Sequence, residues 1–349
     1  SNTTGTRFVA NPSISMPFEA DYGYVKPKLT MNIRKYDLEG GQVNSKSMTI
    51  PTISVDSGVY LDKKLEMGGK NFVQTLEPRI FYSYTPYRNQ ETLPMFDTAL
   101  TDLNLESLFI ENQFVGGDRV MDSNQFTIAA TTRFIDDNGY ERLNATLAQR
   151  FYISDRKVLQ ENQYINSVAQ SDSSDLFLTA TAYLSKVLKI DSEIQYNPDE
   201  GTTNRATFGT RYTPQPGKLI DVSYRLVRNP TDSNNDIKQF NLAGQWPLGA
   251  GWSTIGRYNY DIKQSSAVES LGGFEYDGGC WASRIVINRL SLATTDKPNY
   301  TLFMQIELGG LGSLGASNDD NLLDVLNRNV PGSSFSSGIP EQYRKENLN

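Results

Sequence analysis

The chain has 349 residues, one cysteine, no histidine and a formal net charge of −7. Without histidine it has no Ser-His-Asp relay and no imidazole metal site, and one cysteine cannot form a thiolate cage or an internal disulfide. The acidic balance and the absence of a dense Lys/Arg cluster argue against nucleic-acid binding. We therefore expect no enzyme, no catalytic residue, no metal site, no cofactor and no nucleic-acid partner.

Hydrophobic residues make up 38% of the sequence, and no uninterrupted apolar stretch approaches the ~18 residues that a membrane-spanning helix needs. This excludes a helical membrane protein. The first residues contain no basic segment followed by an apolar one, so we expect any targeting signal to have been removed or to lie outside this sequence.

Apolar and polar side chains alternate from Lys28 onward, with the period of two that a half-buried strand requires. In the first such segment, Leu29, Met31 and Ile33 share one face, and Thr30, Asn32 and Arg34 share the other. The same alternation recurs to the end of the chain, for example in residues 126–134, 142–147, 175–185, 252–262 and 281–288. The sequence predicts about fifteen such strands of roughly ten residues each.

Strands of this length are long for a soluble sandwich, where about five or six residues are usual, and they match the ~9 to 11 residues of a tilted membrane-spanning strand. Connections of two kinds also alternate. Short turns at 20–23, 136–139, 247–251 and 277–279 alternate with longer polar loops, such as those at 87–123, 154–174, 197–202 and 229–236. Membrane barrels have short periplasmic turns and long extracellular loops. We therefore predict an all-β fold, an antiparallel transmembrane β-barrel of the bacterial outer membrane.

This alternation sends the last strand, Tyr300 to Leu308, towards the periplasm. An odd number of strands is unusual for a complete bacterial barrel, so either one strand is missed or the chain is part of a larger barrel. We assign residues 1–311 to the barrel and residues 312–349 to a periplasmic C-terminal tail.

Three separated motifs carry a family resemblance. They are Gln-Thr-Leu-Glu-Pro-Arg at 74–79 followed by the Tyr-Thr-Pro-Tyr-Arg of 84–88, Gly-Gly-Asp-Arg-Val at 116–120 with Ser-Asn-Gln at 123–125, and Phe-Glu-Tyr at 274–276 with Cys-Trp-Ala at 280–282. Their order and spacing resemble the C-terminal barrel half of the LPS-assembly outer-membrane protein family LptD. The resemblance covers most of residues 72–332.

In that family a periplasmic jelly roll precedes a barrel of many strands, and the lipoprotein LptE plugs the barrel. The resemblance implies a partial barrel in the Gram-negative outer membrane that inserts lipopolysaccharide (LPS) into the outer leaflet through a lateral seam. It also implies four partners: an LptE-type plug lipoprotein, LPS, outer-membrane lipid, and periplasmic bridge proteins that bind the missing N-terminal domain. One side of the seam would be the last strand, with Tyr300, Leu302, Met304, Ile306 and Leu308.

Cys280 is a candidate for an interdomain disulfide. In the family, adjacent cysteines near this position bond to cysteines of the periplasmic domain, and the order of the loops independently places the turn at 277–279 at the periplasmic end. This sequence keeps a single thiol, flanked by Gly279 and Trp281. The alternative is an inert thiol in the barrel wall.

Four charged residues are candidates for contact with the lumen or the plug. Glu77 and Arg79 lie opposite the apolar row that includes Leu76, and an arginine facing lipid at the midplane would cost roughly 2 to 4 kcal/mol, so we expect both in the lumen. They would contact the plug or form a wall ion pair. Asp118 and Arg119 lie in the longest loop, which in the family folds into or over the lumen; they would recognise LPS or cap the barrel.

Three other functions are compatible with parts of this pattern. A porin or substrate-specific diffusion channel would share the alternation and the long loops. A barrel enzyme is disfavoured because the well-known examples use histidine. A water-soluble all-β protein is disfavoured by strand length and by the alternation of short and long connections.

Overall fold

The computed structural model of the chain describes residues 4–39, 45–158, 171–229, 232–291, 298–308 and 312–315. The chain divides into two compact units, one of Ser1–Ala180 with Ile194–Thr203 and one of Thr181–Glu193 with Asn204–Asn349. Both units are built from antiparallel strands, and no α-helix occurs in the described ranges. No helix in those ranges is long and apolar enough to cross a membrane.

The first unit is an antiparallel sheet that begins with an interrupted strand. β1 (Thr4–Ala10), β2 (Ser13–Ser15) and β3 (Phe18–Ala20) pair one after another along β4 (Gly23–Glu39). Pro12 and Pro17 lie at the two interruptions, because proline has no N–H to donate to the ladder. The three short pieces therefore act as one strand.

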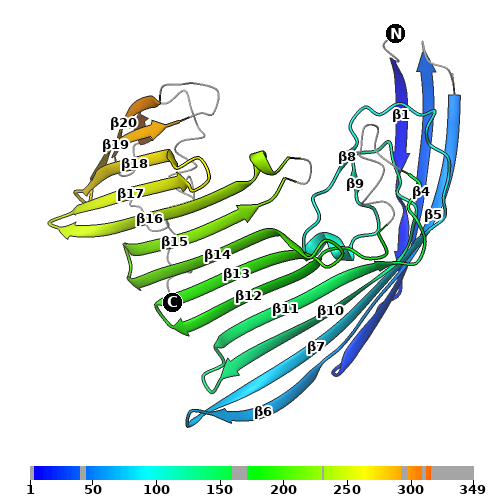
Figure 1. Ribbon diagram of the computed structural model, residues 1–349, viewed down its shortest axis with the longest axis horizontal. Helices are drawn as coiled ribbons and strands as arrows, with labels where there is room; N and C mark the ends of the chain where they lie inside the picture. Colours follow the sequence, from blue (N-terminus) through cyan, green and yellow to red (C-terminus); the bar gives the residue numbers. More distant parts are fainter. Residues whose placement is uncertain are drawn as a thin grey trace. The chain divides into compact units, whose positions relative to one another are not determined.

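The rest of this sheet follows chain order. β4 pairs with β5 (Ser45–Val59), and β7 (Lys70–Thr85) pairs with both β5 and β6 (Leu61–Met67). The break between β5 and β6 lies opposite Pro78 of β7, in agreement with the donor that proline lacks. β7 continues to β10 (Ser123–Asp136) and β10 to β11 (Glu141–Tyr152) (Figure 1).

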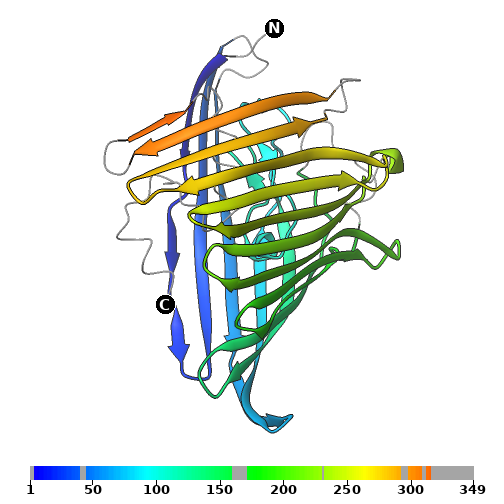
Figure 2. The ribbon, with the colours of Figure 1, turned by 90° about the vertical axis from the view of Figure 1, so that its left-hand side faces the viewer.

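The second unit is a meander of neighbouring strands, seen side by side from green through yellow to orange in Figure 2. Each strand pairs with the next along the chain. The strands are β14 (Thr202–Gln215), β15 (Lys218–Val227), β16 (Ile237–Gly249), β17 (Trp252–Asp261), β18 (Ser266–Asp277), β19 (Trp281–Leu290), β20 (Asn299–Leu308) and β21 (Gly312–Gly315). β12 (Leu176–Ser185) and β13 (Leu188–Asn197) span the boundary between the units.

The short turns lie where predicted, since two to four residues precede β4, β11, β13, β15, β17 and β19. Of the connections at the opposite ends of the strands, those before β10, β12 and β16 have nine residues or more, but those before β14 and β18 have only four residues each. The predicted long loop at 197–202 is therefore a short turn, and the predicted alternation holds only in part. When each interrupted strand is taken as one, fifteen long strands lie in the described residues, which matches the predicted number. The boundary at residue 311 stays a prediction: β21 starts one residue later, and the rest of the proposed tail, 316–349, lies outside the described residues.

Exposure is inverted relative to a water-soluble protein, because polar side chains are buried and apolar ones are exposed. In β4, Leu29 is 38% exposed, whereas Thr30, Asn32 and Arg34 are 7%, 7% and 2% exposed. β20 repeats this, with Gln305 buried and Met304 and Ile306 about half exposed. Apolar side chains gain nothing from facing water, but lipid-facing strands require them. The arrangement contradicts a water-soluble sandwich and agrees with the predicted membrane strands.

Candidate functional site

The long connection between β7 and β10, residues 86–122, packs against one face of the first unit's sheet (Figure 1). We call residues 86–122 the β7–β10 loop and the sheet face that it covers the inner face. The loop contains two short strands, β8 (Ala99–Leu100) and β9 (Phe114–Val115), and a 3₁₀ helix, η1 (Glu106–Phe109). Leu108 is fully buried against Ala129, Ala148 and Phe177. The loop is therefore a packed part of the unit.

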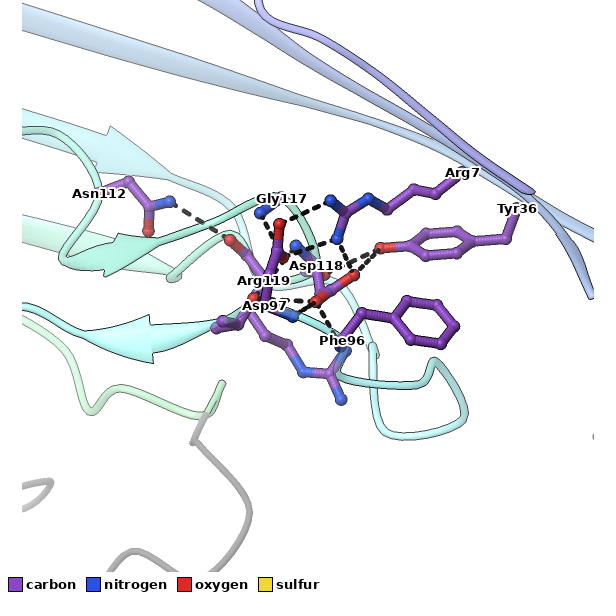
Figure 3. A network of polar contacts seen from close by, with 9 residues as sticks. Arg7, Tyr36, Phe96, Asp97, Asn112, Gly117, Asp118 and Arg119 are labelled. Atoms are coloured by element: carbon purple, nitrogen blue, oxygen red, sulfur yellow. Dashed lines mark hydrogen bonds and ion pairs between the residues drawn. The ribbon is translucent and has the colours of Figure 1, made fainter. Parts of the chain in front are cut away.

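Asp118 is the central anchor of this loop (Figure 3). Its fully buried carboxylate accepts hydrogen bonds from the backbone N–H groups of Phe96 (2.7 Å) and Asp97 (3.0 Å), and from the Tyr36 hydroxyl of β4 (3.4 Å). Arg7 of β1 forms an ion pair with it. A buried charge is tolerated when it is paired and hydrogen-bonded in this way, so Asp118 ties the loop to two strands of the wall.

Asp97 completes the network. Arg7 donates to both of its carboxylate oxygens, each at 2.7 Å, and the N–H of Gly117 donates at 3.0 Å. The hydrogen bonds from the Arg7 guanidinium, followed by the one from Gly117, hold the pKa of Asp97 well below its usual range. Arg7 is thus shared between two loop carboxylates.

Arg119 is also turned into the loop. Its guanidinium is buried and donates to the carbonyl of Leu93 at 2.8 Å, and its own carbonyl accepts from the side chain of Asn112 at 3.3 Å. Asp118 and Arg119 therefore stabilise the loop from within, and their role in capping the barrel stays a prediction. A direct contact of either side chain with LPS would require the loop to open, so the recognition role stays a prediction.

Two further anchors were not identified from the sequence. Glu111 of the loop accepts from Ser54 (2.6 Å) and Thr30 (3.0 Å) on the inner face, and it pairs with Lys28 at 3.3 Å. Arg150 of β11 is fully buried and donates to the carbonyl of Ser107 at 2.7 Å. The sequence pattern places Arg150 on the polar face of its strand, but it gives no sign that either residue contacts its partner.

Glu77 and Arg79 both lie on the inner face, opposite the exposed Leu76, but they do not pair with each other. Arg79 donates to both carboxylate oxygens of Asp56 in β5, at 2.9 and 2.7 Å, and its guanidinium lies 3.8 Å from the centre of the Phe109 ring. Glu77 accepts from Arg133 of β10 at 2.9 Å. Both residues therefore form wall ion pairs, and their contact with a plug stays a prediction.

A cavity of about 320 Å³ lies between η1 of the loop and the inner face. Four charged side chains line it: Glu77, Glu106, Arg79 and Arg133. Tyr24, Tyr60, Thr131 and Thr146 also line it, and the rest of its walls is apolar or glycine: Gly58, Val59, Pro78, Leu105, Phe109 and Ala129. Its volume lies at the lower end of the range of small-molecule sites, and its lining combines polar and apolar groups.

Comparison with known proteins identifies the family. The sequence matches the LptD family, described as LPS transport system D, over residues 1–252. The chain belongs to the LptD family. The LPS-assembly protein LptD of Thiobacillus denitrificans is 39% identical over 339 residues, which cover 97% of this chain and 45% of that protein. LptD of Azoarcus sp. is 36% identical, over 94% of this chain and 40% of its own length.

This LptD-family chain thus spans less than half the length of these relatives. Among solved structures it is similar to a mutant of the ferric enterobactin receptor PfeA of Pseudomonas aeruginosa, with a TM-score of 0.39 and 10% identity over 88% of this chain and 55% of that one. The family assignment confirms the predicted resemblance. With the exposed apolar face, it also confirms the predicted fold class, part of an antiparallel outer-membrane β-barrel, and the location in the Gram-negative outer membrane.

Cys280 of this LptD-family chain lies in the short turn between β18 and β19. The thiol is exposed and free, and its Sγ lies 3.9 Å from the carbonyl oxygen of Gly278. It is the chain's single cysteine, so any disulfide partner must belong to another segment or another chain. The accessible position fits the predicted interdomain bond, which stays a prediction.

The predicted seam residues lie on β20. Tyr300, Leu302, Met304, Ile306 and Leu308 all point to the exposed face. β20 pairs with β19 along its whole length, whereas β21 pairs only with Gln305–Leu308. Within the described part of the chain, no second strand pairs with Asn299–Met304, so the backbone of this half is a sheet edge.

No group of three or more potential metal ligands lies together in the ranges that the structure describes.

Proposed function

We propose that this chain is part of the wall of an outer-membrane translocon that inserts LPS into the outer leaflet. The observation that carries the proposal is the separation of side chains in an LptD-family chain: in β19 and β20, polar groups such as Arg284 and Gln305 are buried on one face, and apolar groups such as Ile285 and Leu302 are exposed on the other. An amphiphile has a saccharide that needs polar surroundings and acyl chains that need lipid. A wall of this kind offers both environments to one molecule where two strands separate.

The seam is the place where two strands can separate at the lowest cost in free energy. A sheet edge presents unpaired N–H and C=O groups that accept another strand, and the Asn299–Met304 half of β20 is an edge within the described residues. In the full-length protein an earlier barrel strand would pair there. If few backbone hydrogen bonds joined β20 to that strand, the two strands could part. The saccharide of LPS would then remain inside the barrel while its acyl chains enter the membrane beside Leu302 and Met304.

The partners follow from the same proposal. An LptE-type plug lipoprotein would contact the inner face, with Glu77 and Arg79 as candidate contacts. Periplasmic bridge proteins would deliver LPS to the N-terminal domain of the full-length protein, and Cys280 would bond to that domain. No reaction is part of this function, so we propose that the protein is not an enzyme.

The test is a disulfide across the seam of the full-length protein. One cysteine replaces Leu302 and the other is placed in the first barrel strand, both in a Cys280→Ser background, and newly exported LPS is measured at the cell surface. Oxidation should block export, and a reductant should restore it. The control joins Leu302 to Ile287, which already face each other in the β19–β20 register, and should leave export unchanged.

Normal export with the seam oxidised would contradict the proposal. A full-length protein that conducts small solutes, and whose loss leaves surface LPS unchanged, would instead support the diffusion-channel alternative.

A further inference from the structure

The cavity between η1 and the inner face has a lining that matches one class of ligand. We propose that it is a binding subsite for a single uncharged sugar ring of the LPS saccharide. The inference rests on the proposed function, because it names which part of LPS the inner face would hold. It is argued from the charge, the hydrogen-bonding groups and the aromatic rings of the cavity.

The charges of the cavity are balanced. Two carboxylates, Glu77 and Glu106, and two guanidinium groups, Arg79 and Arg133, line it. Both arginines are already neutralised, since Arg79 pairs with Asp56 at 2.7 Å and Arg133 pairs with Glu77 and Glu141, each at 2.9 Å. A phosphate group would need positive charge that is not already paired. The lining therefore favours an uncharged ligand over the phosphorylated end of LPS.

The same groups offer hydrogen bonds to hydroxyls. A guanidinium has five N–H donors, and the ion pairs with carboxylates use two of those of Arg79 and two of those of Arg133. The Thr131 and Thr146 hydroxyls lie 2.8 Å apart on the neighbouring strands β10 and β11. These closely spaced donors and acceptors can all bond to the hydroxyls of a sugar ring. An acyl chain would displace water from the same groups without offering them hydrogen bonds, which is unfavourable.

Aromatic rings and aliphatic side chains supply the remaining surface of the cavity. Tyr60 is about half exposed, and its ring centre lies 6.1 Å from that of Tyr24. The C–H groups of a sugar ring pack against the electron-rich face of an aromatic ring. Gly58 helps to place Tyr24, because a Cβ at Gly58 would lie 2.7 Å from a carbon of the Tyr24 ring. The wall is therefore preorganised for a small rigid ligand, which lowers the cost of binding.

The experiment uses the full-length protein with its plug partner in cells and places a photo-crosslinking amino acid at Thr146, inside the cavity. The control position is Leu147, the next residue, which is exposed on the opposite face. The probe is the cell's own LPS, detected in the adduct with an antibody against its saccharide. We expect a saccharide-containing adduct at Thr146 and little or none at Leu147.

A second variant tests whether a sugar ring occupies the cavity. Thr146→Trp fills the cavity and should reduce the adduct formed from a crosslinker at Thr131 about tenfold, the effect of losing one well-placed contact. The matched Leu147→Trp change should leave that adduct unaltered.

Other outcomes overturn the inference. An adduct with the plug protein at Thr146 would make the cavity a protein contact, and no adduct there would remove the subsite. A crosslinker at Met304 separates these failures from failure of the proposed function. If LPS is captured at Met304 but not at Thr146, the subsite is rejected and the proposed function in LPS transport is retained. If LPS is captured at neither position, and surface LPS is unchanged after the full-length protein is depleted, both the subsite and the proposed function are rejected.

Discussion

Glu77 and Arg79 lie two residues apart on the same face of β7, yet their ion pairs run in opposite directions across the sheet. Arg79 pairs with Asp56 of β5, and Glu77 pairs with Arg133 of β10. Side chains at i and i+2 share a face, and each of these two reaches a diagonal neighbour on the adjacent strand, because Arg79 lies opposite Gly58 and Glu77 lies opposite Thr131. The two residues therefore join three consecutive strands of the wall.

The Arg79–Asp56 pair should contribute measurably to the stability of this wall. Arg79→Ala and Asp56→Ala are each expected to destabilise the full-length barrel, and a double-mutant cycle should give a coupling of about 1 kcal/mol, modest because Arg79 is more than one-third exposed. Urea unfolding in lipid vesicles measures it. Strictly additive effects would show that the pair contributes nothing.

The anchoring of the β7–β10 loop by Asp118 should be stronger. Asp118→Asn keeps the size of the side chain but removes the charge that pairs with Arg7, and it should cost about 2 to 3 kcal/mol because the site is buried. The expected readout is faster protease cleavage within residues 86–122. Glu91→Gln, at an exposed position of the same loop, is the control. Equal cleavage of the two variants would refute the anchor.

The Asp97–Arg7 contact predicts a dependence on pH. Since the folded pKa of Asp97 is depressed, its stabilising contribution is complete above the ordinary aspartate value of about 4 and is lost as the pH falls through the lower folded value. Asp97→Asn should therefore lower the unfolding temperature by a constant amount above pH ~5. That difference should shrink in more acidic buffer. A difference that persists unchanged in strong acid would rule out Asp97 as the titrating group.

We expect an introduced charge to destabilise the protein more on one face of β11 than on the other. Leu147→Arg places a charge on the face that we assign to lipid and should cost roughly 2 to 4 kcal/mol if the site lies near the bilayer midplane. Thr146→Arg, one residue earlier, faces the polar cavity and should cost less. Folding yield into vesicles, read from heat-dependent gel mobility, compares them. Equal yields would contradict the assignment of the faces.

The accessible thiol of Cys280 gives a redox prediction for the native full-length protein. If Cys280 forms the proposed bond to the periplasmic domain, a maleimide reagent should fail to label it until a reductant is added. Complete labelling without reductant would show that Cys280 is a free thiol in the turn.

The period-two pattern was sufficient to identify the strands and to place residues on their two faces. The inner-face positions of Glu77 and Arg79 and the exposed row on β20 follow from it, because the alternation of side chains is a property of each strand by itself. The pattern did not predict the three-part first strand. There Pro12 and Pro17 interrupt a ladder whose existence depends on pairing with β4.

The sequence by itself determined the strand type, the two faces, the approximate number of strands and, through three motifs, the family. The tertiary structure alone decided the partners of the polar residues. Asp118 meets Arg7, 111 positions away, and Glu111 meets Thr30, 81 positions away. Such contacts depend on strand register and on how a long loop folds back over the sheet, and neither is encoded in local periodicity. The cavity arises from these distant contacts, since its lining comes from the loop and from strands far apart in the chain.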